Sequence, residues 1–563
     1  MPRISIKVSS FVFLAASGCL AQTQTQTEFN WTSIKPSAKL KWTKCYGEGF
    51  ECARLLVPLD YASPKNSKTA AIAMTRLRST SSSSTYRGSL LINPGGPGGS
   101  GVEYVLEAGS EIAGIVGAEY DIVGFDPRGV SFSTPSVSWF VNDAERAMWN
   151  PPNANAMYHS LNESTIALPY AYARSQVQSQ LAAARDAGFL QYITTDYTAQ
   201  DMLTITEAFG FEKLQYWGVS YGSVLGATFA ALFPDKLERV VIDGVLPINE
   251  WYSSNISNTM LDTDKVLNAF FTSCFEAGPT ICAFHNNANA SSASDIAGAF
   301  QTLLSSIQQT PVPAIASLTQ GNAGYGIIDY TLLKNTIFHA LYAPYDLFPA
   351  LAQALADLAA GNGTTLYATS GVEEFTCGGA SALDRSFEAA VSIICSDMTP
   401  NVTLPDLRAV YAREEALSQF ADLWANWRAA CAGWKIRRPG RYTGPTGPMK
   451  TIAPMLVIGN TLDPVTPWPG ANQTANILFP GSGLLTYNTL GHTSFTAPSS
   501  CINSWVYAYF KNGTLPPAGT VCQPDAGVQL FSPNGTDGLI ERDLVDGVSV
   551  NGRVTKRKLP FRL

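Results

Sequence analysis

Residues 214–233 read LQYWGVSYGSVLGATFAALF, which places a serine between a short apolar run and a run of helix formers. The pattern predicts a buried strand, a sharp turn at Ser220 and then a helix. Gly218 and Gly222 stand two residues on either side of the serine, where larger side chains would collide in so tight a turn. The stretch therefore predicts a turn that projects the Ser220 hydroxyl from the edge of a sheet.

The first 250 residues alternate between apolar strands bounded by glycine and amphipathic helices. We expect a helix over 198–209 and strands over 55–61, 68–74, 88–93, 120–126, 214–217 and 237–243. Alternation of this kind is typical of the α/β class, with a mostly parallel sheet covered by helices on both faces.

Strand patterns fade from about 251 to 440, where helical patterns such as 347–358 and 407–427 dominate. They return at 455–459 and 484–487, ahead of a helix over 503–510. We therefore expect a helical cap inserted into the sheet domain. The expected division is a signal peptide over 1–21, core over 22–250, cap over 251–440, core over 441–523 and a C-terminal extension over 524–563.

Composition and the first residues indicate an exported protein. The 563 residues carry 37 Lys and Arg against 44 Asp and Glu, and a net charge of −7 argues against a nucleic-acid partner. Arg3 and Lys7 precede an apolar run over 11–16, and small residues stand before Gln22, as in a cleaved secretory signal. No apolar run is long enough to span a bilayer, so we expect a secreted, extracellular protein without a membrane partner.

Cysteines and glycosylation sequons agree with export. Beyond Cys19 nine cysteines remain, and pairing by proximity leaves Cys377 over. The expected disulfides are Cys45–Cys52, Cys274–Cys282, Cys395–Cys431 and Cys501–Cys522. No histidine spacing accompanies the cysteines, so we expect neither a metal nor a cofactor. Asn-x-Ser/Thr sequons, which a secreted protein can glycosylate, occur at Asn30, Asn162, Asn255, Asn289, Asn362, Asn401, Asn472, Asn512 and Asn534.

A serine hydroxyl needs a base, and the base needs a third group that fixes its tautomer. Of the four histidines, His492 alone follows a late strand, at 484–487. Asp463 follows the strand before it, and its alternative reading is a residue of an Asp-Pro turn. The chain order Ser220, Asp463, His492 is that of the α/β-hydrolase fold.

A glycine-rich loop, Pro94 to Gly98, follows the strand over 88–93. The backbone N–H groups of Gly95 and Gly96, with that of Tyr221, are predicted to form an oxyanion hole, where each donor typically contributes about 3 kcal/mol. A phosphate-binding loop is disfavoured because the Walker lysine is absent. The nearby segment Asp126-Pro-Arg-Gly is expected to brace these loops through an internal ion pair.

The elbow, the loop over 93–101 and the segment over 233–244 resemble those of the secreted tripeptidyl aminopeptidases of the prolyl-iminopeptidase class. Residues 462–467 and 491–493 match the C-terminal module of that family, and the resemblance runs from Trp42 to Cys522. It implies an α/β-hydrolase that releases short peptides or a proline-type residue from a free N-terminus. It also implies that Ser220, Asp463 and His492 form the triad. Asn93 is a departure, because related iminopeptidases have a histidine there.

An exopeptidase must bind a protonated amine, and a buried cation needs a carboxylate partner. The candidates are Glu103, Glu373, Glu374 and Asp397, each of which has an alternative reading as a solvated charge or a helix cap. The predicted reaction is attack by Ser220, proton transfer through His492 and hydrolysis of an acyl-enzyme. Two alternatives stay open: an esterase, lactonase or amidase for a small natural product, for example in a biosynthetic pathway, and a non-catalytic binding protein. The second usually lacks a triad member, and none is missing here.

Overall fold

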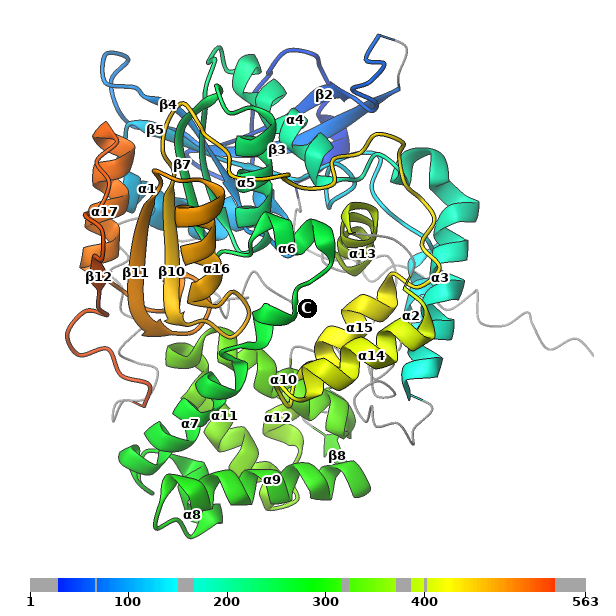
Figure 1. Cartoon of the computed structure of the whole chain (residues 1–563), viewed down its shortest axis with the longest axis vertical. Helices are drawn as coiled ribbons and strands as arrows, with labels where there is room; N and C mark the ends of the chain where they lie inside the picture. Colours follow the sequence, from blue (N-terminus) through cyan, green and yellow to red (C-terminus); the bar gives the residue numbers. More distant parts are fainter. Residues whose placement is uncertain are drawn as a thin grey trace, which may run out of the picture.

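The computed structural model describes residues 29–65, 68–149, 167–315, 324–370, 386–398 and 402–531. Within these ranges ten strands form one sheet in the order β1-β2-β3-β5-β4-β6-β7-β10-β11-β12 (Figure 1). Strands β1, β2, β3 and β5 pair antiparallel along one side, and all pairs from β5 to β12 are parallel. The bounds are β1 (Thr43–Lys44), β2 (Phe50–Pro58), β3 (Thr69–Leu77), β4 (Gly88–Asn93), β5 (Tyr120–Phe125), β6 (Leu214–Val219), β7 (Leu237–Asp243), β10 (Leu456–Leu462), β11 (Gly483–Leu490) and β12 (Val521–Cys522). The mostly parallel sheet that the sequence predicts is confirmed.

Helices cover both faces of this sheet, and strand β4 shows why its sequence is apolar throughout. Leu90 and Ile92 pack in a cluster with α1 and α17, whereas Leu91 between them packs with α4, α5 and α16. Because side chains alternate along a strand, a strand buried on both faces needs apolar residues at every position. These helices are α1 (Gly101–Val116), α4 (Thr195–Ala208), α5 (Tyr221–Leu232), α16 (Trp468–Gln473) and α17 (Ser500–Asn512).

Between β7 and β10 lies a mainly helical region with its own apolar core, which includes Phe270, Leu333 and Phe348. In Figure 1 it runs from green to yellow below and beside the sheet. Its elements are α6 (Ile248–Ser253), α7 (Thr263–Ala277), α8 (Ala283–Ala288), α9 (Ala293–Gln309), β8 (Val312–Ile315), β9 (Tyr325–Ile328), α10 (Tyr330–Tyr342), α11 (Pro344–Ala359), α12 (Thr364–Thr369), α13 (Ser386–Asp397), α14 (Leu404–Glu415) and α15 (Ala421–Ala430). We refer to this region as the cap.

Two features of the cap differ from the sequence prediction. The helical pattern over 407–427 is two helices, because the chain turns between α14 and α15, where the Ser418 hydroxyl accepts the N–H of Phe420. Helix α3 (Ala167–Leu190) precedes the elbow, yet Leu168 packs with Leu407 of α14 and Ala425 of α15. The cap side is therefore assembled from two separate stretches of the chain.

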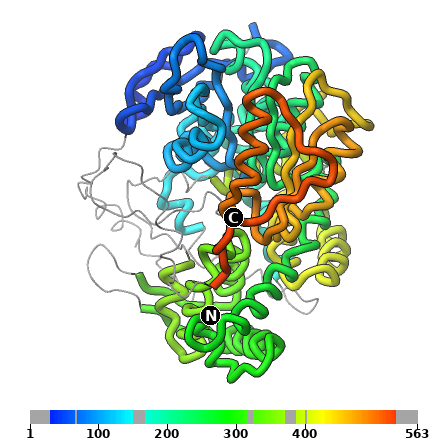
Figure 2. Tube along the Cα trace, turned by 90° about the vertical axis from the view of Figure 1, so that its left-hand side faces the viewer, coloured from blue at the N-terminus to red at the C-terminus, as the bar shows by residue number. Residues whose placement is uncertain are grey.

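The chain returns to the cap after the last strand. Asp525 donates its N–H to the carbonyl of Pro498 in the sheet domain, at 2.9 Å. Phe531 then lies 6.0 Å from Phe270 and 6.5 Å from Phe348, measured between ring centres in the cap. Figure 2 shows this red segment running from the sheet domain onto the green helices. The first part of the predicted extension thus connects the two parts of the molecule.

The structure contains the four predicted disulfides, Cys45–Cys52, Cys274–Cys282, Cys395–Cys431 and Cys501–Cys522. Cys377 lies outside the described residues. Arg128 of the Asp126-Pro-Arg-Gly segment is fully buried and forms an ion pair with Asp201 of α4, at 2.6 Å. Asp126 accepts the Ser100 hydroxyl next to the glycine loop, at 2.7 Å. No helix in the described ranges combines the length and the apolar character that crossing a bilayer requires.

Candidate active site

Ser220 sits in a strained turn between β6 and α5. Its backbone angles are φ 58° and ψ −125°, a conformation that costs a residue with a side chain roughly 1–3 kcal/mol. The turn is held by the Ser220 N–H, which donates to the carbonyl of Asp243 at 2.9 Å. A Cβ on Gly218 would lie 2.2 Å from the carbonyl oxygen of Gly222, so that glycine is sterically required. Backbone strain that the surrounding packing maintains is typical of residues at functional sites.

His492 and Asp463 form a buried pair at the ends of the neighbouring strands. His492 Nδ1 lies 2.9 Å and 3.0 Å from the two carboxylate oxygens of Asp463. The carboxylate also accepts the N–H groups of Val465, Thr466 and Thr493 at 2.8–3.1 Å. Burial alone would raise the pKa of Asp463, but the imidazole and these donors together hold that pKa below its usual value. The pair is thus arranged to fix the ring orientation and tautomer of His492.

The imidazole lies close to the end of β7, whose last residue, Asp243, accepts the Ser220 N–H. A Cβ on Gly244, the residue after Asp243, would lie 3.2 Å from His492 Cε1. Among the described residues no hydrogen bond joins the Ser220 hydroxyl to His492, and the Nε2 atom is buried. In enzymes without substrate this bond is often long or poorly aligned and tightens only in the reacting complex.

Asp243 ties the nucleophile turn to the histidine loop. Its carbonyl accepts the Ser220 N–H, and its carboxylate accepts the N–H of Ser494 at 2.9 Å and the Ser494 hydroxyl at 2.5 Å. Burial raises the pKa of Asp243 to about 6, which the bonds from Ser494 partly oppose. Asp243 was not among the predicted site residues, although its position at the end of the strand beside the elbow was a usable signal.

The glycine loop packs directly on the elbow, and it corrects one part of the oxyanion prediction. A Cβ on Gly95 would lie 2.4 Å from the carbonyl oxygen of Val219 and 2.9 Å from the N atom of Tyr221. The N–H of Gly95 donates to Oδ1 of Asn93 at 3.0 Å, so it is not available to a substrate oxygen. Gly96 is exposed and lines the cavity together with Tyr221. Gly95 therefore allows the glycine loop to pack closely against the elbow. Gly96 and Tyr221 remain the candidate N–H donors to an oxyanion.

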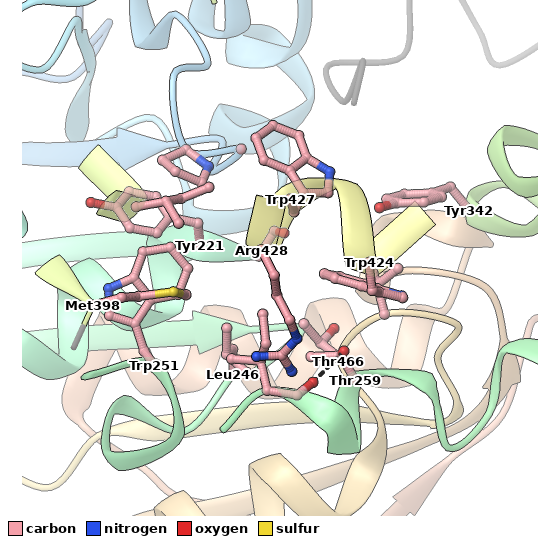
Figure 3. A pocket seen from close by; sticks show the side chains of 16 residues that line it. Tyr221, Leu246, Trp251, Thr259, Tyr342, Met398, Trp424, Trp427, Arg428 and Thr466 are labelled. Atoms are coloured by element: carbon pink, nitrogen blue, oxygen red, sulfur yellow. Dashed lines mark hydrogen bonds between the residues drawn. The ribbon is translucent and has the colours of Figure 1, made fainter. Parts of the chain in front are cut away.

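A cavity opens between the elbow and the cap. Gly96, Ser220 and Tyr221 contribute to its sheet side, and α6, α13 and α15 contribute apolar side chains to its cap side (Figure 3). The largest of these are Trp251, Met398, Trp424 and Trp427. Of the described residues that line the cavity, only Arg428 carries a charge.

Of the carboxylates predicted to bind an amine, the two that the structure describes, Glu103 and Asp397, do not line this cavity. Asp397 is buried behind it and accepts hydrogen bonds from the Thr195 N–H and hydroxyl and from the Trp251 indole, at 2.5–3.0 Å. Burial raises the pKa of Asp397 to about 7, although these donors oppose the shift. Glu103 lies in the first turn of α1 and is not among the lining residues. The remaining two candidates, Glu373 and Glu374, lie outside the described residues.

Among the described sequons, five place an exposed asparagine at the surface: Asn30, Asn255, Asn289, Asn362 and Asn512. Asn472 is half-buried, and the Thr474 of its sequon is buried. Three further sequons, at Asn162, Asn401 and Asn534, lie outside the described residues. In the described part of the chain, no group of three or more His, Cys, Asp or Glu side chains could hold a metal ion.

Comparison with known proteins agrees with this geometry. Residues 88–275 match the α/β-hydrolase fold family, and residues 417–522 match the TAP-like protein family. Serine protease Hip1 of Mycobacterium tuberculosis is 28% identical over 506 residues, 86% of this chain and 91% of that protein. Tripeptidyl aminopeptidase of Streptomyces coelicolor is 26% identical and covers 87% of each chain, and carboxylesterase B of Mycobacterium tuberculosis is 27% identical and covers 84% of this chain and 86% of its own. The chain is therefore an enzyme of the α/β-hydrolase type, a serine hydrolase related in sequence to the tripeptidyl aminopeptidases.

Proposed function

We propose that this enzyme is a secreted serine peptidase that cleaves an amide bond near the free N-terminus of peptides through an acyl-enzyme. The observation that carries the proposal is the buried Asp463–His492 pair, whose imidazole lies close to Gly244, next to the Asp243 carbonyl that accepts the Ser220 N–H. The serine protease and tripeptidyl aminopeptidase relatives support a peptide substrate.

In the proposed reaction Ser220 Oγ attacks the scissile carbonyl carbon while His492 Nε2 takes the hydroxyl proton. Asp463 keeps the Nδ1 proton of the imidazole in place and stabilises the imidazolium. The N–H groups of Gly96 and Tyr221 donate to the oxyanion. The C–N bond then breaks, and the imidazolium gives its proton to the leaving amine. Water, deprotonated by the same imidazole, hydrolyses the ester and restores the serine.

The experiment is labelling with a fluorophosphonate together with turnover of aminoacyl and tripeptidyl amides. Wild type is expected to be labelled once, and Ser220→Ala is expected to lose both the label and turnover. Ser223→Ala is the matched control, because Ser223 lies in the same turn but its hydroxyl accepts the Leu246 N–H and does not line the cavity. Labelling or turnover that survives Ser220→Ala would contradict the proposal, and an unlabelled wild type would favour a non-catalytic binding protein.

Secretion and glycosylation belong to the same proposal, as does the absence of nucleic-acid and membrane partners. The predicted N-terminal signal, the four disulfides and the exposed sequon asparagines support secretion and glycosylation. Expression in a eukaryotic host is expected to release into the medium a protein whose N-terminus begins near Gln22 and whose mass falls on treatment with an N-glycosidase. Retention of an intact N-terminus inside the cell would contradict this part of the proposal.

One observation favours a second candidate, an esterase, lactonase or amidase for a small apolar substrate. No carboxylate is among the described residues that line the cavity, and one relative is named a carboxylesterase. Substrates with a free amine and the same substrates N-acylated separate the two candidates. Preference for the free amine supports the exopeptidase, whereas preference for blocked amides or for esters supports the second candidate.

A further inference from the structure

The cap side of the cavity is built from large apolar side chains that surround the space in front of Ser220. Trp424 and Trp427 come from α15, Trp251 from α6 and Met398 from the end of α13. In Figure 3 Trp251 and Met398 lie on one side, Trp424 lies on the other, and Trp427 lies at the top. Aromatic walls of this size bury 150–250 Å² each when fully covered, so they gain most from a ligand that is itself large and apolar.

The one charged residue among the described lining residues is already neutralised by the protein. Arg428 forms an ion pair with Glu414, which is fully buried, and donates to the carbonyl of Ser254 at 2.7 Å. Only 11% of the Arg428 side chain is exposed. A charged substrate side chain would lose its hydration against these residues without gaining a partner from them, which is strongly unfavourable. The described part of the lining therefore favours an uncharged side chain over an acidic or a basic one.

The apolar wall is held in place from behind. The disulfide Cys395–Cys431 joins α13 to the residue that ends α15, so the two helices that supply Met398, Trp424 and Trp427 are cross-linked. Asp397 accepts the indole N–H of Trp251 at 3.0 Å. Thr195, which donates to the same carboxylate, is also hydrogen-bonded to the phenol of Tyr221. A pocket fixed in this way loses little conformational entropy when a ligand enters.

We propose that this cavity is the acyl-side specificity pocket and that it takes a large aromatic or branched apolar side chain. The substrates are then peptides or esters in which a residue such as phenylalanine, leucine or tryptophan supplies the carbonyl that Ser220 attacks. The inference rests on the proposed function, since it takes Ser220 as the nucleophile. Trp427 and Trp424 are the specificity-determining residues, because they present the cap wall that an acyl side chain meets.

The test uses the full-length enzyme and p-nitroanilides whose acyl residue is Phe, Leu, Ala, Gly, Lys or Glu. We expect kcat/KM for Phe and Leu to exceed that for Gly, Lys and Glu by about 100-fold or more, since one well-filled apolar pocket discriminates by 10–200-fold per methylene. Trp427→Ala is expected to lower kcat/KM for Phe at least tenfold and to leave the Ala substrate within about threefold. Trp427→Phe should restore most of the loss, and Trp505→Ala on α17, away from the cavity, should leave the preference unchanged.

A second measurement separates failure of the pocket from failure of the proposed function. Diphenyl aminoalkylphosphonates with a benzyl or a methyl side chain inactivate a nucleophilic serine without requiring turnover. Faster inactivation by the benzyl reagent, lost in Trp427→Ala, supports the pocket even if no amide is cleaved. If both reagents label Ser220 at equal rates, the pocket proposal fails and the proposed function stands. The same holds if the enzyme prefers substrates with Lys or Glu as the acyl residue, or if the leaving group sets the preference. Absence of labelling at Ser220 would overturn the proposed function.

Discussion

Replacing Asp463 with asparagine removes a charge from the acid–base pair and keeps the shape of the side chain. The carboxylate lies 2.9 Å from His492 Nδ1 and accepts hydrogen bonds from the N–H groups of Val465, Thr466 and Thr493. An asparagine can keep its oxygen toward Val465 and Thr466, but its NH₂ group then faces the Thr493 N–H and Nδ1 of His492. That contact favours the imidazole tautomer that is protonated on Nε2, which cannot accept the proton of the serine.

The expected magnitudes separate a chemical effect from a structural one. One buried N–H left without its acceptor costs about 1–3 kcal/mol of stability. In the serine proteases on which the triad is best understood, the equivalent exchange lowers kcat about 10⁴-fold, or about 5.5 kcal/mol at 1.36 kcal/mol per tenfold. We expect Asp463→Asn to remain folded and to lose kcat on that scale.

The assay is kcat for an active substrate, with thermal unfolding measured on the same samples. Asp262→Asn is the control, because Asp262 is a buried carboxylate that forms an ion pair with Lys265, at 2.6 Å. It should keep kcat within about threefold. If folded Asp463→Asn retains more than about a tenth of the wild-type kcat, the tautomer argument is refuted.

Three further predictions follow from the same geometry. Gly95→Ala introduces a Cβ 2.4 Å from a carbonyl oxygen of the elbow, so kcat should fall about 100-fold, as for a displacement of the reacting groups by about 1 Å. The control is Gly114→Ala, whose Cβ would meet nothing within 4 Å and which should keep activity and gain stability. A fully active Gly95→Ala would contradict the packing argument. Asp243→Asn and Ser494→Ala should each lower kcat/KM, and in a double-mutant cycle the two losses should not add, because both break the same tie to the histidine loop; additive losses would show that the residues act separately. Burial raises the pKa of Asp397 from the ordinary aspartate range to about 7, so the folded state binds the proton more tightly than the unfolded state does. This group therefore makes the protein less stable as the pH rises from about 4 to about 7. Asp397→Asn should compare better with wild type at pH 8 than at pH 5 in thermal unfolding, and a difference in melting temperature that does not change with pH would contradict the assignment.

Several strands could be predicted closely because their apolar runs are bounded by glycine or by charged residues. The strand over 237–243 has the predicted bounds, and that over 88–93 does too. The prediction was poorer at β2, which begins at Phe50, because that strand is antiparallel and carries polar residues, such as Glu51 and Arg54, at half-buried positions. A strand that mixes polar and apolar residues gives a weaker signal than a continuous apolar run.

The parts of the site whose chemistry restricts the residue type could be predicted from the sequence. The parts that depend on how side chains pack could not. The serine turn and the acid–base pair follow from the order of strands, since parallel strands end at one edge of a sheet. The hydrogen bond from the Gly95 N–H to Asn93 Oδ1 could not be predicted, because it depends on the rotamer of Asn93, which no motif specifies. The cavity wall brings together Trp251 and Trp427, residues from two helices far apart in the chain. Their spacing in the sequence is equally compatible with an ordinary apolar core.

The most direct test of the proposed chemistry is a crystal structure of the enzyme after reaction with a phosphonate. The account predicts a phosphorus bonded to Ser220 Oγ and a phosphonyl oxygen within about 3 Å of the Gly96 and Tyr221 nitrogens. It also predicts His492 Nε2 within about 3.2 Å of the modified serine oxygen or the bound phosphonyl group. Modification of another residue, or an imidazole that stays beyond that reach, would contradict it.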